Sequence, residues 1–384
     1  MRKKIVVLGS TGSIGRATLD VIAQQEEKFE VLGLACRENI ALLKEQVERF
    51  KSPFVSTYDD GADRIGPIGA ATVLPGMEGM KEMIGMDAHI VVNALPGSIG
   101  LEPTIEALKQ NKVLALANKE SLVMGGRMVE ALLRIGTGKL IPVDSEHSAI
   151  YQLLKSVPGK ELSHLTITAS GGPFRGLSIE DLERVSPAEA LNHPTWKMGN
   201  KITLDSATMM NKGLEVIEAR WLFDISPDRI KVVVHPESII HGIIEFVDNG
   251  IMAYLSYPDM RIPIAYALNE EERHPLPFGK LSMDEPFNLT FHPPDLERFP
   301  CLRLAYEALE MGDSALIAVN SANEVAAAAF VEGKISFTQI PILIEEALSH
   351  HPAARVIDTV DSIWEIHRLT KEFTERKLGE FYGH

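Results

Sequence analysis

The sequence predicts an α/β protein whose N-terminal third forms a parallel, doubly wound sheet. Three observations lead to this fold class. Short apolar segments alternate with amphipathic segments from residue 4 to residue 117, as they do in βαβ units. The first apolar segment runs directly into a glycine-rich turn at 9–15. Residues 301–384 are almost entirely helical in pattern, which indicates a separate helical region at the end of the chain.

The elements of the N-terminal third follow from hydrophobic periodicity taken in chain order. Apolar, β-branched runs predict strands, and apolar residues at helical spacing predict helices. The expected strands cover residues 4–8, 29–36, 53–56, 88–95 and 112–117. The expected helices cover residues 16–25, 40–50 and 101–110.

The pattern changes after a strand at 140–143 that ends at Asp144. Residues 186–200 have little periodicity and are expected to form a loop. Further strands are expected at 165–170, 201–205, 231–236, 238–247 and 251–258, and helices at 147–157 and 207–222. Short connections between the last three strands favour a mixed or antiparallel sheet.

Six prolines between residues 273 and 300 predict a linker. Helices are then expected near 301–311, 314–332, 338–349 and 359–377. The sequence therefore divides into a sheet domain at 1–144, an α+β domain with a mixed sheet at 145–272, a linker at 273–300 and a helical bundle at 301–384.

Composition excludes several classes of function. The chain has 384 residues, with 53 acidic against 38 basic side chains and a net charge of −15. This acidity argues against nucleic-acid binding, which needs a basic face, but it leaves room for a small phosphorylated substrate. Two cysteines form no disulfide framework and favour a reducing compartment. The apolar run after the basic start is too short for a signal peptide, and no apolar stretch reaches 18 residues. A cytoplasmic protein without membrane association is expected.

The glycine turn Gly9-x-x-Gly12-x-x-Gly15 is the first motif that could carry chemistry. It follows a strand and opens a helix, so its backbone N–H groups could bind the pyrophosphate of a dinucleotide in a Rossmann-like domain. The alternative is a turn that only packs the helix on the sheet. After the second strand, Arg37 could pair with the 2′-phosphate of NADP and so favour that cofactor. Glu38 could bind the free 2′-hydroxyl of NAD and so favour NAD.

Two further motifs follow predicted strands. Lys119, between Asn118 and Glu120, could face the binding crevice, or the segment could simply start a helix with Asn118 as its cap. Asp144 and Glu146 lie two residues apart at a strand end, where they could share one side and bind a hard divalent cation. The alternative is a helix N-terminus, where acidic residues are favoured by the dipole.

The segment from Asp205 to Glu215 carries the densest set of polar groups. Asn211, Lys212 and Glu215 can share one helical face, where the first two could donate to a phosphate and the carboxylate could complete an oxygen-ligand set with the two acids above. The alternative is a surface ion pair between Lys212 and Glu215. Gly213, costly inside a helix, indicates close approach of another group.

Two loops remain open between a functional and a structural interpretation. The turn after Ser170 could form a second anion nest or an ordinary glycine turn. The loop at 192–198, with His193, Trp196 and Met198, could form a lid over a site or pack on its own domain. His147, His235 and His241 are expected to satisfy hydrogen bonds, and no zinc spacing is present. A different two-domain NAD(P) dehydrogenase, or a non-catalytic dinucleotide sensor, would also explain the glycine turn.

Taken together, these segments resemble the 1-deoxy-D-xylulose 5-phosphate reductoisomerase family from end to end. The segments that carry the resemblance are GSTGSIG at 9–15, ALANKES at 115–121, PVDSEHSAI at 142–150, ASGGPFR at 169–175, HPTWKMG at 193–199, LDSATMMNKGLE at 204–215, HPESIIH at 235–241, YPDMRIPIAYAL at 257–268, FPCLRLA at 299–305 and NSANEVAAAAF at 320–330.

The resemblance assigns roles by position. It implies divalent-metal ligands at Asp144, Glu146 and Glu215. It implies substrate contacts at Lys119, Ser145, Glu146, Ser170, His193, Ser206, Asn211, Lys212 and Glu215, of which Ser170, Ser206, Asn211 and Lys212 would bind the phosphate. It implies cofactor contacts at Thr11, Gly12, Ser13, Ile14, Arg37, Asn39, Asn118, Glu120 and Gly199. Trp196 and Met198 would form a flexible lid.

The same resemblance implies a reaction and its cofactors. The substrate would be isomerised by retro-aldol cleavage and re-aldol closure on Mg²⁺ or Mn²⁺, and the resulting aldehyde would be reduced by NADPH to 2-C-methyl-D-erythritol 4-phosphate, a step of isoprenoid precursor biosynthesis. The catalytic groups would be Lys119, Asp144, Glu146 and Glu215. Domain 1–144 would bind NADPH, and domain 145–272 would hold the catalytic groups and the homodimer interface.

Overall fold

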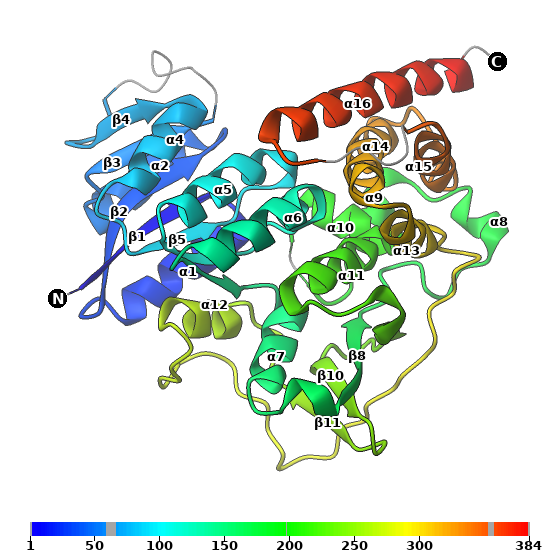
Figure 1. Ribbon diagram of the computed structural model, residues 1–384, viewed down its shortest axis with the longest axis horizontal. Helices are drawn as coiled ribbons and strands as arrows, with labels where there is room; N and C mark the ends of the chain where they lie inside the picture. The colour runs from blue at the N-terminus through cyan, green and yellow to red at the C-terminus, as the bar shows by residue number, and fades with distance from the viewer. Residues whose placement is uncertain (1, 59–66, 197, 352–356, 383–384) are drawn as a thin grey trace. The chain divides into compact units, whose positions relative to one another are not determined.

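The structure is a computed structural model that describes residues 2–58, 67–196, 198–351 and 357–382. The chain forms two compact units (Figure 1). The first unit comprises Met1–Ser121, Met128–Ser148 and Asp259–Gly279, and the second comprises Leu122–Arg127, Ala149–Pro258 and Lys280–His384. Three of the chain crossings between them fall within helices, two in α6 (Glu120–Ile135) and one in α7 (Ser145–Leu154).

The first unit is built on a seven-stranded sheet. Its strands, in order across the sheet, are β4 (Thr72–Pro75), β3 (Phe54–Thr57), β2 (Phe29–Cys36), β1 (Lys3–Leu8), β5 (Ile90–Asn93), β6 (Val113–Leu116) and β7 (Lys139–Pro142). All six strand pairs are parallel. The chain builds outward from β1 in one direction and then, from β5, in the other. The predicted doubly wound fold is therefore confirmed.

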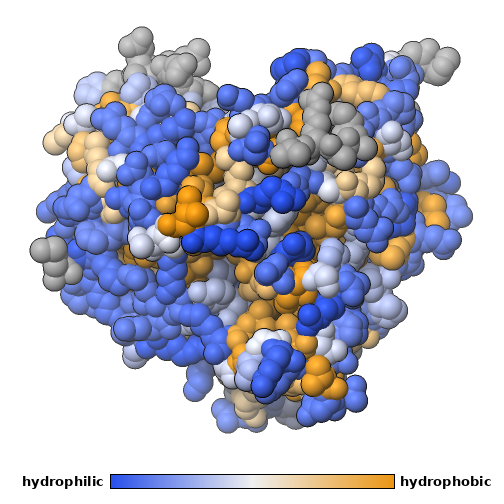
Figure 2. Space-filling view, in the orientation of Figure 1, coloured by the Kyte–Doolittle hydropathy of each residue, from blue (hydrophilic) through white to orange (hydrophobic). Residues whose placement is uncertain are grey.

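Helices complete the first unit. They are α1 (Ser13–Gln24), α2 (Ile40–Phe50), α4 (Gly76–Gly85), α5 (Leu101–Lys109), α12 (Arg261–Leu268) and a short 3₁₀ turn, η1 (Gly97–Gly100). The central strands β1 and β5 are buried almost throughout, as expected for a parallel sheet covered on both faces. The face of this unit seen in Figure 2 is mostly hydrophilic, in keeping with the charged composition.

The second unit has a smaller, mixed sheet. Its strands, in order, are β11 (Ile251–Leu255), β10 (Ile240–Phe246), β8 (Leu162–Ala169) and β9 (Ile230–Val234). β8 pairs parallel with β9, whereas β10 pairs antiparallel with both β8 and β11. This arrangement confirms the mixed sheet expected from the short connections.

The other elements of the second unit are helical. They are η2 (Gly159–Glu161), α8 (Ile179–Leu182), α9 (Pro187–Ala190), α10 (Asn200–Ala207), α11 (Met210–Phe223), η3 (Pro227–Arg229), α13 (Cys301–Met311), α14 (Asp313–Val331), α15 (Gln339–His350) and α16 (Val360–Tyr382). α14 packs against α13, α15 and α16. One apolar core runs from the β8 sheet through α11 to these helices.

α14 is the one helix among the described residues that is long and apolar enough to cross a membrane. Its most apolar 18-residue window has a mean hydropathy of 1.3, and 83% of that window is buried inside the protein. The buried positions face α13, α15 and α16, so we interpret α14 as the central core helix of the second unit.

Some elements differ from the sequence expectation. Residues 201–205, expected as a strand, lie in α10, where Thr203 Oγ1 donates to the carbonyl of Gly199 at 3.0 Å. Thr203, Leu204 and Ala207 are buried at helical spacing, so tertiary packing overrides the β-branched composition. β4, α4, α8, α9 and α12 were not expected, and α9 lies within residues 186–200, which were expected to form a loop. Residues 273–300 contain no helix or strand, and the functional division at residues 144, 272 and 300 stays a prediction.

Candidate active site

In the glycine turn of the first unit, no side chain among the described residues caps the backbone at the start of α1. Gly9 has φ +82°, and a Cβ on it would lie 2.4 Å from the carbonyl oxygen of Ala94. A Cβ on Gly15 would lie 2.2 Å from the carbonyl oxygen of Gly9. The first glycine therefore permits the turn and the third permits the helix to pack on it. Gly12 caps α1 without a side chain, which leaves the helix N-terminus suited to a phosphate.

This turn lies at the point where the strand order reverses. β1 and β5 are neighbours in the sheet, but the chain leaves them in opposite directions. In doubly wound sheets such a point opens a crevice at the carboxyl ends of the strands, where ligands bind. Gly9 follows β1, and the loop from Ala94 follows β5. Thr11, Ser13 and Ile14 lie in the same turn and first helical positions, so the structure brings these predicted cofactor contacts together.

The Asn118 side chain holds the loop after β5 and the start of α6 together through hydrogen bonds. Its Nδ2 donates to the carbonyls of Leu95 and Gly97, both at 2.8 Å, and to Glu120 at 3.1 Å. Its Oδ1 accepts from the backbone N–H of Ser121 at 2.8 Å. The side chain is almost fully buried. The segment does start a helix, as the structural alternative expected, but the N-cap position is Lys119 and not Asn118. The hydrogen bonds of Asn118 connect the start of α6 to the loop after β5.

The end of β2 carries the groups expected to select the cofactor. Arg37 and Glu38 are both exposed and face each other, with Nε and Oε1 3.4 Å apart. Asn39 caps α2, because its Oδ1 accepts from the backbone N–H of Leu42 at 3.1 Å. From the sequence, Arg37 favoured NADP and Glu38 favoured NAD. In the structure their opposite charges compensate each other.

Lys119 and Asp144 meet at the carboxyl ends of two adjacent strands. Lys119 follows β6 and Asp144 follows β7, and their Nζ and Oδ2 atoms are 2.7 Å apart with both side chains largely buried. Ser145 donates a hydrogen bond to the neighbouring Glu146. A buried cation beside a carboxylate at this edge of the sheet is a group that can hold or move a proton.

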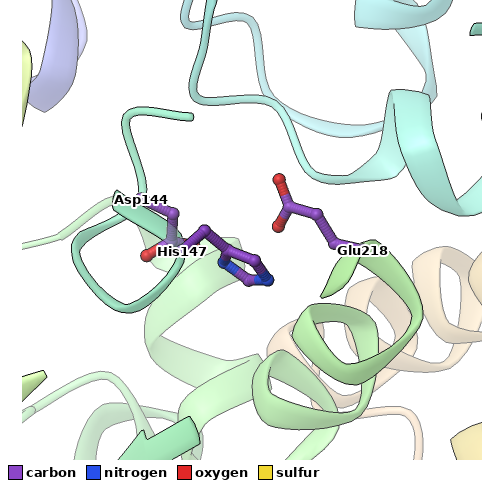
Figure 3. A group of neighbouring side chains, drawn as sticks. All are labelled: Asp144, His147 and Glu218. Carbon is purple, nitrogen blue, oxygen red and sulfur yellow. The ribbon is translucent and has the colours of Figure 1, made fainter. Parts of the chain in front are cut away.

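The acidic pair follows the strand instead of belonging to it. The carboxylates of Asp144 and Glu146 do lie together, within 4.8 Å of each other, but not through strand alternation, because β7 ends at Pro142 and α7 begins at Ser145. Glu146 is in the first turn of the helix. Figure 3 shows that Asp144 and His147 come from the same turn, and that Glu218 extends from α11.

In the second unit, three predicted residues form one cluster on α11. Asn211 Nδ2 donates to Glu215 Oε1 at 2.6 Å, and Lys212 forms an ion pair with Glu215 Oε2. Lys212 is 4% exposed and Glu215 only 1%. The alternative of a surface ion pair is therefore wrong, because the pair is buried. Gly213 approaches α13, since a Cβ there would lie 2.7 Å from that of Ala305. The close approach that Gly213 indicated is helix packing.

The Ser170 loop lies beside the end of α10. Gly171 and Gly172 both have positive φ, at +80° and +66°, and a Cβ on Gly172 would lie 2.7 Å from the carbonyl oxygen of Ser206. The two predicted serines are thus held on neighbouring backbone segments. Ser170 Oγ lies 2.9 Å from His193 Nε2, which adds a third predicted residue to the group.

The hydrogen bonds of His193 fix its tautomer. Its Nδ1 accepts from the backbone N–H groups of Thr195 at 3.1 Å and Trp196 at 2.9 Å. The proton of the neutral ring is therefore on Nε2, which donates to Ser170. Burial, and secondly the charge of Arg175, lower the pKa of His193. The imidazole is thus a neutral donor at pH 7.

The residues predicted to form a lid, Trp196 and Met198, come shortly after His193 in the sequence. The Trp196 ring lies 6.4 Å from that of His241, edge to face, and Met198 is half-buried. Lys197 lies outside the described residues. Gly199 caps α10. His235, as expected, satisfies hydrogen bonds: its Nδ1 lies 2.9 Å from the Thr290 carbonyl oxygen and its Nε2 accepts from two backbone N–H groups.

Asp205, a buried carboxylate at the start of the polar segment next to this group, was given no role from the sequence. Asp205 is 2% exposed; its Oδ2 accepts from Lys201 Nζ at 2.8 Å and its Oδ1 from Asn323 Nδ2 at 2.9 Å. The i, i+4 spacing of Lys201 and Asp205 was the available signal. Asn323 belongs to α14 and has no local signal. Asp205 directly precedes Ser206, so it anchors the helix end that carries that serine.

Comparison with known proteins gives a consistent result. Family models described as 1-deoxy-D-xylulose 5-phosphate reductoisomerase match residues 5–126, those of its C-terminal domain match residues 140–223, and a further C-terminal domain of DXP reductoisomerase matches residues 255–373. A relative from Caldanaerobacter subterraneus subsp. tengcongensis named 1-deoxy-D-xylulose 5-phosphate reductoisomerase is 49% identical over 98% of this chain and 99% of its own. One from Chlorobaculum tepidum is 45% identical over 98% and 100%.

Solved structures agree in fold. A crystal structure of DOX-P reductoisomerase in complex with NADPH, fosmidomycin and magnesium superposes with a TM-score of 0.92 at 35% identity, covering 98% of both chains. The enzyme of Zymomonas mobilis in complex with NADPH superposes with a TM-score of 0.90 at 35% identity, covering 98% of this chain and 99% of the other.

Proposed function

The chain belongs to the 1-deoxy-D-xylulose 5-phosphate reductoisomerase family, and we propose on that premise that it converts 1-deoxy-D-xylulose 5-phosphate to 2-C-methyl-D-erythritol 4-phosphate. The reaction is an isomerisation followed by reduction with NADPH in the presence of a divalent cation. It supplies a branched precursor for isoprenoid biosynthesis. The observation that carries the proposal is the buried cluster of Asn211, Lys212 and Glu215, because a glycine turn alone is common to other dehydrogenases.

For NADPH, we propose that the pyrophosphate lies on the N-terminus of α1. The bare backbone at Gly12 and the dipole of the helix favour an anion there. Arg37 is exposed at the end of β2, where a guanidinium can pair with the 2′-phosphate. The full set proposed to contact the cofactor is Thr11, Gly12, Ser13, Ile14, Arg37, Asn39, Asn118, Glu120 and Gly199. Because Glu38 faces Arg37 and partly neutralises its charge, we expect the ratio of the affinity for NADPH to that for NADH to be smaller than it would be with an unpaired arginine.

For the metal, we propose Asp144, Glu146 and Glu215 as ligands. Three carboxylates form an all-oxygen donor set, which fits Mg²⁺ or Mn²⁺ and disfavours zinc. The negative charge of these side chains also fits a cation. Glu215 is buried, and because both of its carboxylate oxygens accept from a donor, its side chain is held in the ionised form that can bind a metal ion. When bound, such a cation polarises a carbonyl and stabilises developing negative charge on oxygen. Magnesium is named in the crystal structures of three DOX-P reductoisomerase chains similar to this one.

For the substrate, we propose that its phosphate binds in the second unit. Ser170, Ser206, Asn211 and Lys212 supply donors, and His193 supplies a neutral N–H through Nε2. Hydrogen bonds from such groups to a phosphate are charge-assisted and therefore strong. The glycine pair after Ser170 permits the close approach of the loop to α10, so the donors are pre-organised before substrate arrives.

The remaining groups act on the reacting carbons. The Nζ of Lys119 lies beside the carboxylate of Asp144, where it can donate a proton. Ser145 directly follows Asp144 in the sequence. We propose that Lys119 and Ser145 orient the hydroxyl groups of the substrate, and that the Trp196 and Met198 segment closes over the site. Exclusion of water strengthens the electrostatic contacts and protects the aldehyde before its reduction.

We further propose a cytoplasmic homodimer. β11 is an edge strand of its sheet, and Ile251 on it and Val247 before it are 67% and 68% exposed. An apolar edge strand is a template for pairing with a second chain. Light scattering should therefore give twice the monomer mass, and Ile251→Lys should reduce it, whereas Ile135→Lys, at an 83% exposed position on α6, should not. An unchanged mass in Ile251→Lys would exclude this edge.

The experiment that tests the function follows NADPH absorbance in the presence of 1-deoxy-D-xylulose 5-phosphate, with and without EDTA. We expect oxidation that stops on chelation and returns with excess Mg²⁺ or Mn²⁺; the metal that restores the higher rate at cellular concentrations is the physiological one. Absence of EDTA-sensitive oxidation would overturn the proposal.

A substitution localises the metal requirement. Glu215→Gln keeps the size of the side chain and removes its charge, so we expect turnover to be lost at all Mg²⁺ concentrations while the Kd for NADPH is unchanged. Glu183→Gln, at an exposed position in the same unit, is the matched control. Full turnover in Glu215→Gln would exclude the assigned ligand set.

A further inference from the structure

We propose that Arg175 is a further contact for the substrate phosphate and supplies the positive charge that the other phosphate groups lack. This inference rests on the proposed function and extends its phosphate site by one residue. Arg175 lies five residues after Ser170, at the end of the same glycine turn. Three observations, on charge, position and backbone support, carry it.

The first observation is a shortage of positive charge. A phosphate monoester carries close to two negative charges at pH 7. Ser170, Ser206 and Asn211 are neutral, and the depressed pKa of His193 keeps it neutral as well. Lys212 is the one cation in the set, and it forms a buried ion pair with Glu215. The set proposed for the phosphate therefore supplies a single positive charge, shared with Glu215, against close to two negative charges on the phosphate.

The second observation is the position of the Arg175 side chain. A Cβ on Gly171 would lie 3.4 Å from Cδ of Arg175 and 3.5 Å from its Cβ, so the side chain passes over the backbone that follows Ser170. The charge of Arg175 also reaches His193, whose pKa it helps to depress. The aliphatic part of the Arg175 side chain therefore lies beside the turn that carries Ser170, and its positive charge acts on His193.

The third observation is that this cation is uncompensated but its backbone is held. Among residues 2–58, 67–196, 198–351 and 357–382, no carboxylate forms an ion pair with Arg175. Some other cations of the unit are paired, as Lys201 is with Asp205 and Arg298 with Asp295. Arg298 Nη1 donates to the carbonyls of Arg175 at 3.0 Å and Leu177 at 2.7 Å, which fixes the segment that carries the free guanidinium.

The chemistry fits an arginine at this place. A guanidinium presents a planar fork of N–H donors that matches two phosphate oxygens. Because Arg175 contacts the phosphate and not the reacting carbons, it binds ground state and transition state equally. Its removal should therefore raise KM and leave kcat unchanged.

The test compares Arg175→Ala and Arg175→Lys with Arg184→Ala in the full-length protein. Arg184 is an exposed arginine of the same unit and controls for net charge. We expect Arg175→Ala to raise the KM for 1-deoxy-D-xylulose 5-phosphate about tenfold, equivalent to about 1.4 kcal/mol, with kcat and the Kd for NADPH unchanged. Arg175→Lys should recover part of this loss, and Arg184→Ala should show none of it.

Two further measurements separate a phosphate contact from a structural role. With 1-deoxy-D-xylulose, which lacks the phosphate, kcat/KM should be the same in wild type and Arg175→Ala. Calorimetric binding of inorganic phosphate to the protein with NADPH bound should weaken about tenfold in Arg175→Ala, and this readout needs no turnover.

The outcomes are distinct for the two proposals. If wild-type protein shows no EDTA-sensitive oxidation, the proposed function fails, and calorimetry still decides whether Arg175 binds phosphate. If wild type is active and Arg175→Ala matches Arg184→Ala in KM and in phosphate affinity, the inference is overturned. Equal losses with phosphorylated and unphosphorylated substrates would also overturn it, because they would indicate a structural role.

Discussion

Replacing Asp205 with alanine is expected to destabilise the second unit by about 3 kcal/mol and to loosen the helix end that carries Ser206. Asp205 is buried and accepts from Lys201 at 2.8 Å and Asn323 at 2.9 Å. Alanine leaves both donors without this acceptor. Since Asp205 is adjacent to Ser206, the same change should raise the KM for the phosphorylated substrate.

The magnitude follows from the burial of the two partners. Asn323 is 1% exposed, and a buried amide that loses its acceptor costs about 1–3 kcal/mol. Breaking a fully buried ion pair costs about 3–5 kcal/mol, but the Lys201 side chain is 22% exposed and can turn partly toward water. A total of about 3 kcal/mol is therefore expected, well above the cost of about 0.5 kcal/mol for an ordinary surface change.

Urea unfolding followed by tryptophan fluorescence suits this measurement, because Trp196, Trp221 and Trp364 all belong to the second unit. Asp228→Ala, at an exposed position of the same unit, is the control.

A double-mutant cycle sharpens the test. Asn323→Ala should cost less in the Asp205→Ala background than in wild type, since the two side chains share one hydrogen bond. A loss below 1 kcal/mol in Asp205→Ala, or strictly additive effects in the cycle, would refute the assignment of Asp205 as the anchor of α10.

Further predictions concern other parts of the chain. Gly15→Ala should abolish NADPH binding measured by fluorescence titration, because its Cβ would lie 2.2 Å from the first carbonyl of the glycine turn, whereas Gly85→Ala, which meets open space, should not; normal NADPH affinity in Gly15→Ala would contradict the packing role. Gly213→Ala should lower the free energy of unfolding by about 1–3 kcal/mol through overpacking against α13 without changing the Mg²⁺ requirement, and an altered metal dependence would favour a ligand role. Burial lowers the pKa of His367 to about 4, against about 6.5 when unfolded. As pH falls from 6.5 to 4, the unfolded state takes up the proton first, so stability should fall by up to about 3 kcal/mol; His367→Gln should show a smaller fall in urea unfolding over this window, and an identical fall would exclude His367 as the cause.

Local chemistry explains what the sequence could predict. The glycine turn depends on contacts within a few residues, so its place between a strand and a helix was readable. The alternation of strands and helices gave the parallel sheet for the same reason. Residues 201–205 were misassigned because β-branched side chains favour strands, and only the core around α10 decides otherwise.

Contacts from distant parts of the chain explain what the sequence could not predict. Asn323 reaches Asp205 across 118 residues, and Ala305 is the neighbour that requires Gly213. Neither partner is marked by spacing or composition. Arg175 differs again: its importance lies in having no carboxylate partner among the described residues, which no motif reveals.

Burial decides between the two interpretations of the α11 cluster. The spacing of Asn211, Lys212 and Glu215 indicates a shared helical face, but an exposed pair on such a face is common and contributes little. With Lys212 4% and Glu215 1% exposed, both charges must be taken out of water, which is costly unless each is hydrogen-bonded. Both oxygens of Glu215 do accept a donor. The desolvation cost of burying these charges is the physical reason for our proposal that the cluster binds a ligand; a surface ion pair would carry no such cost.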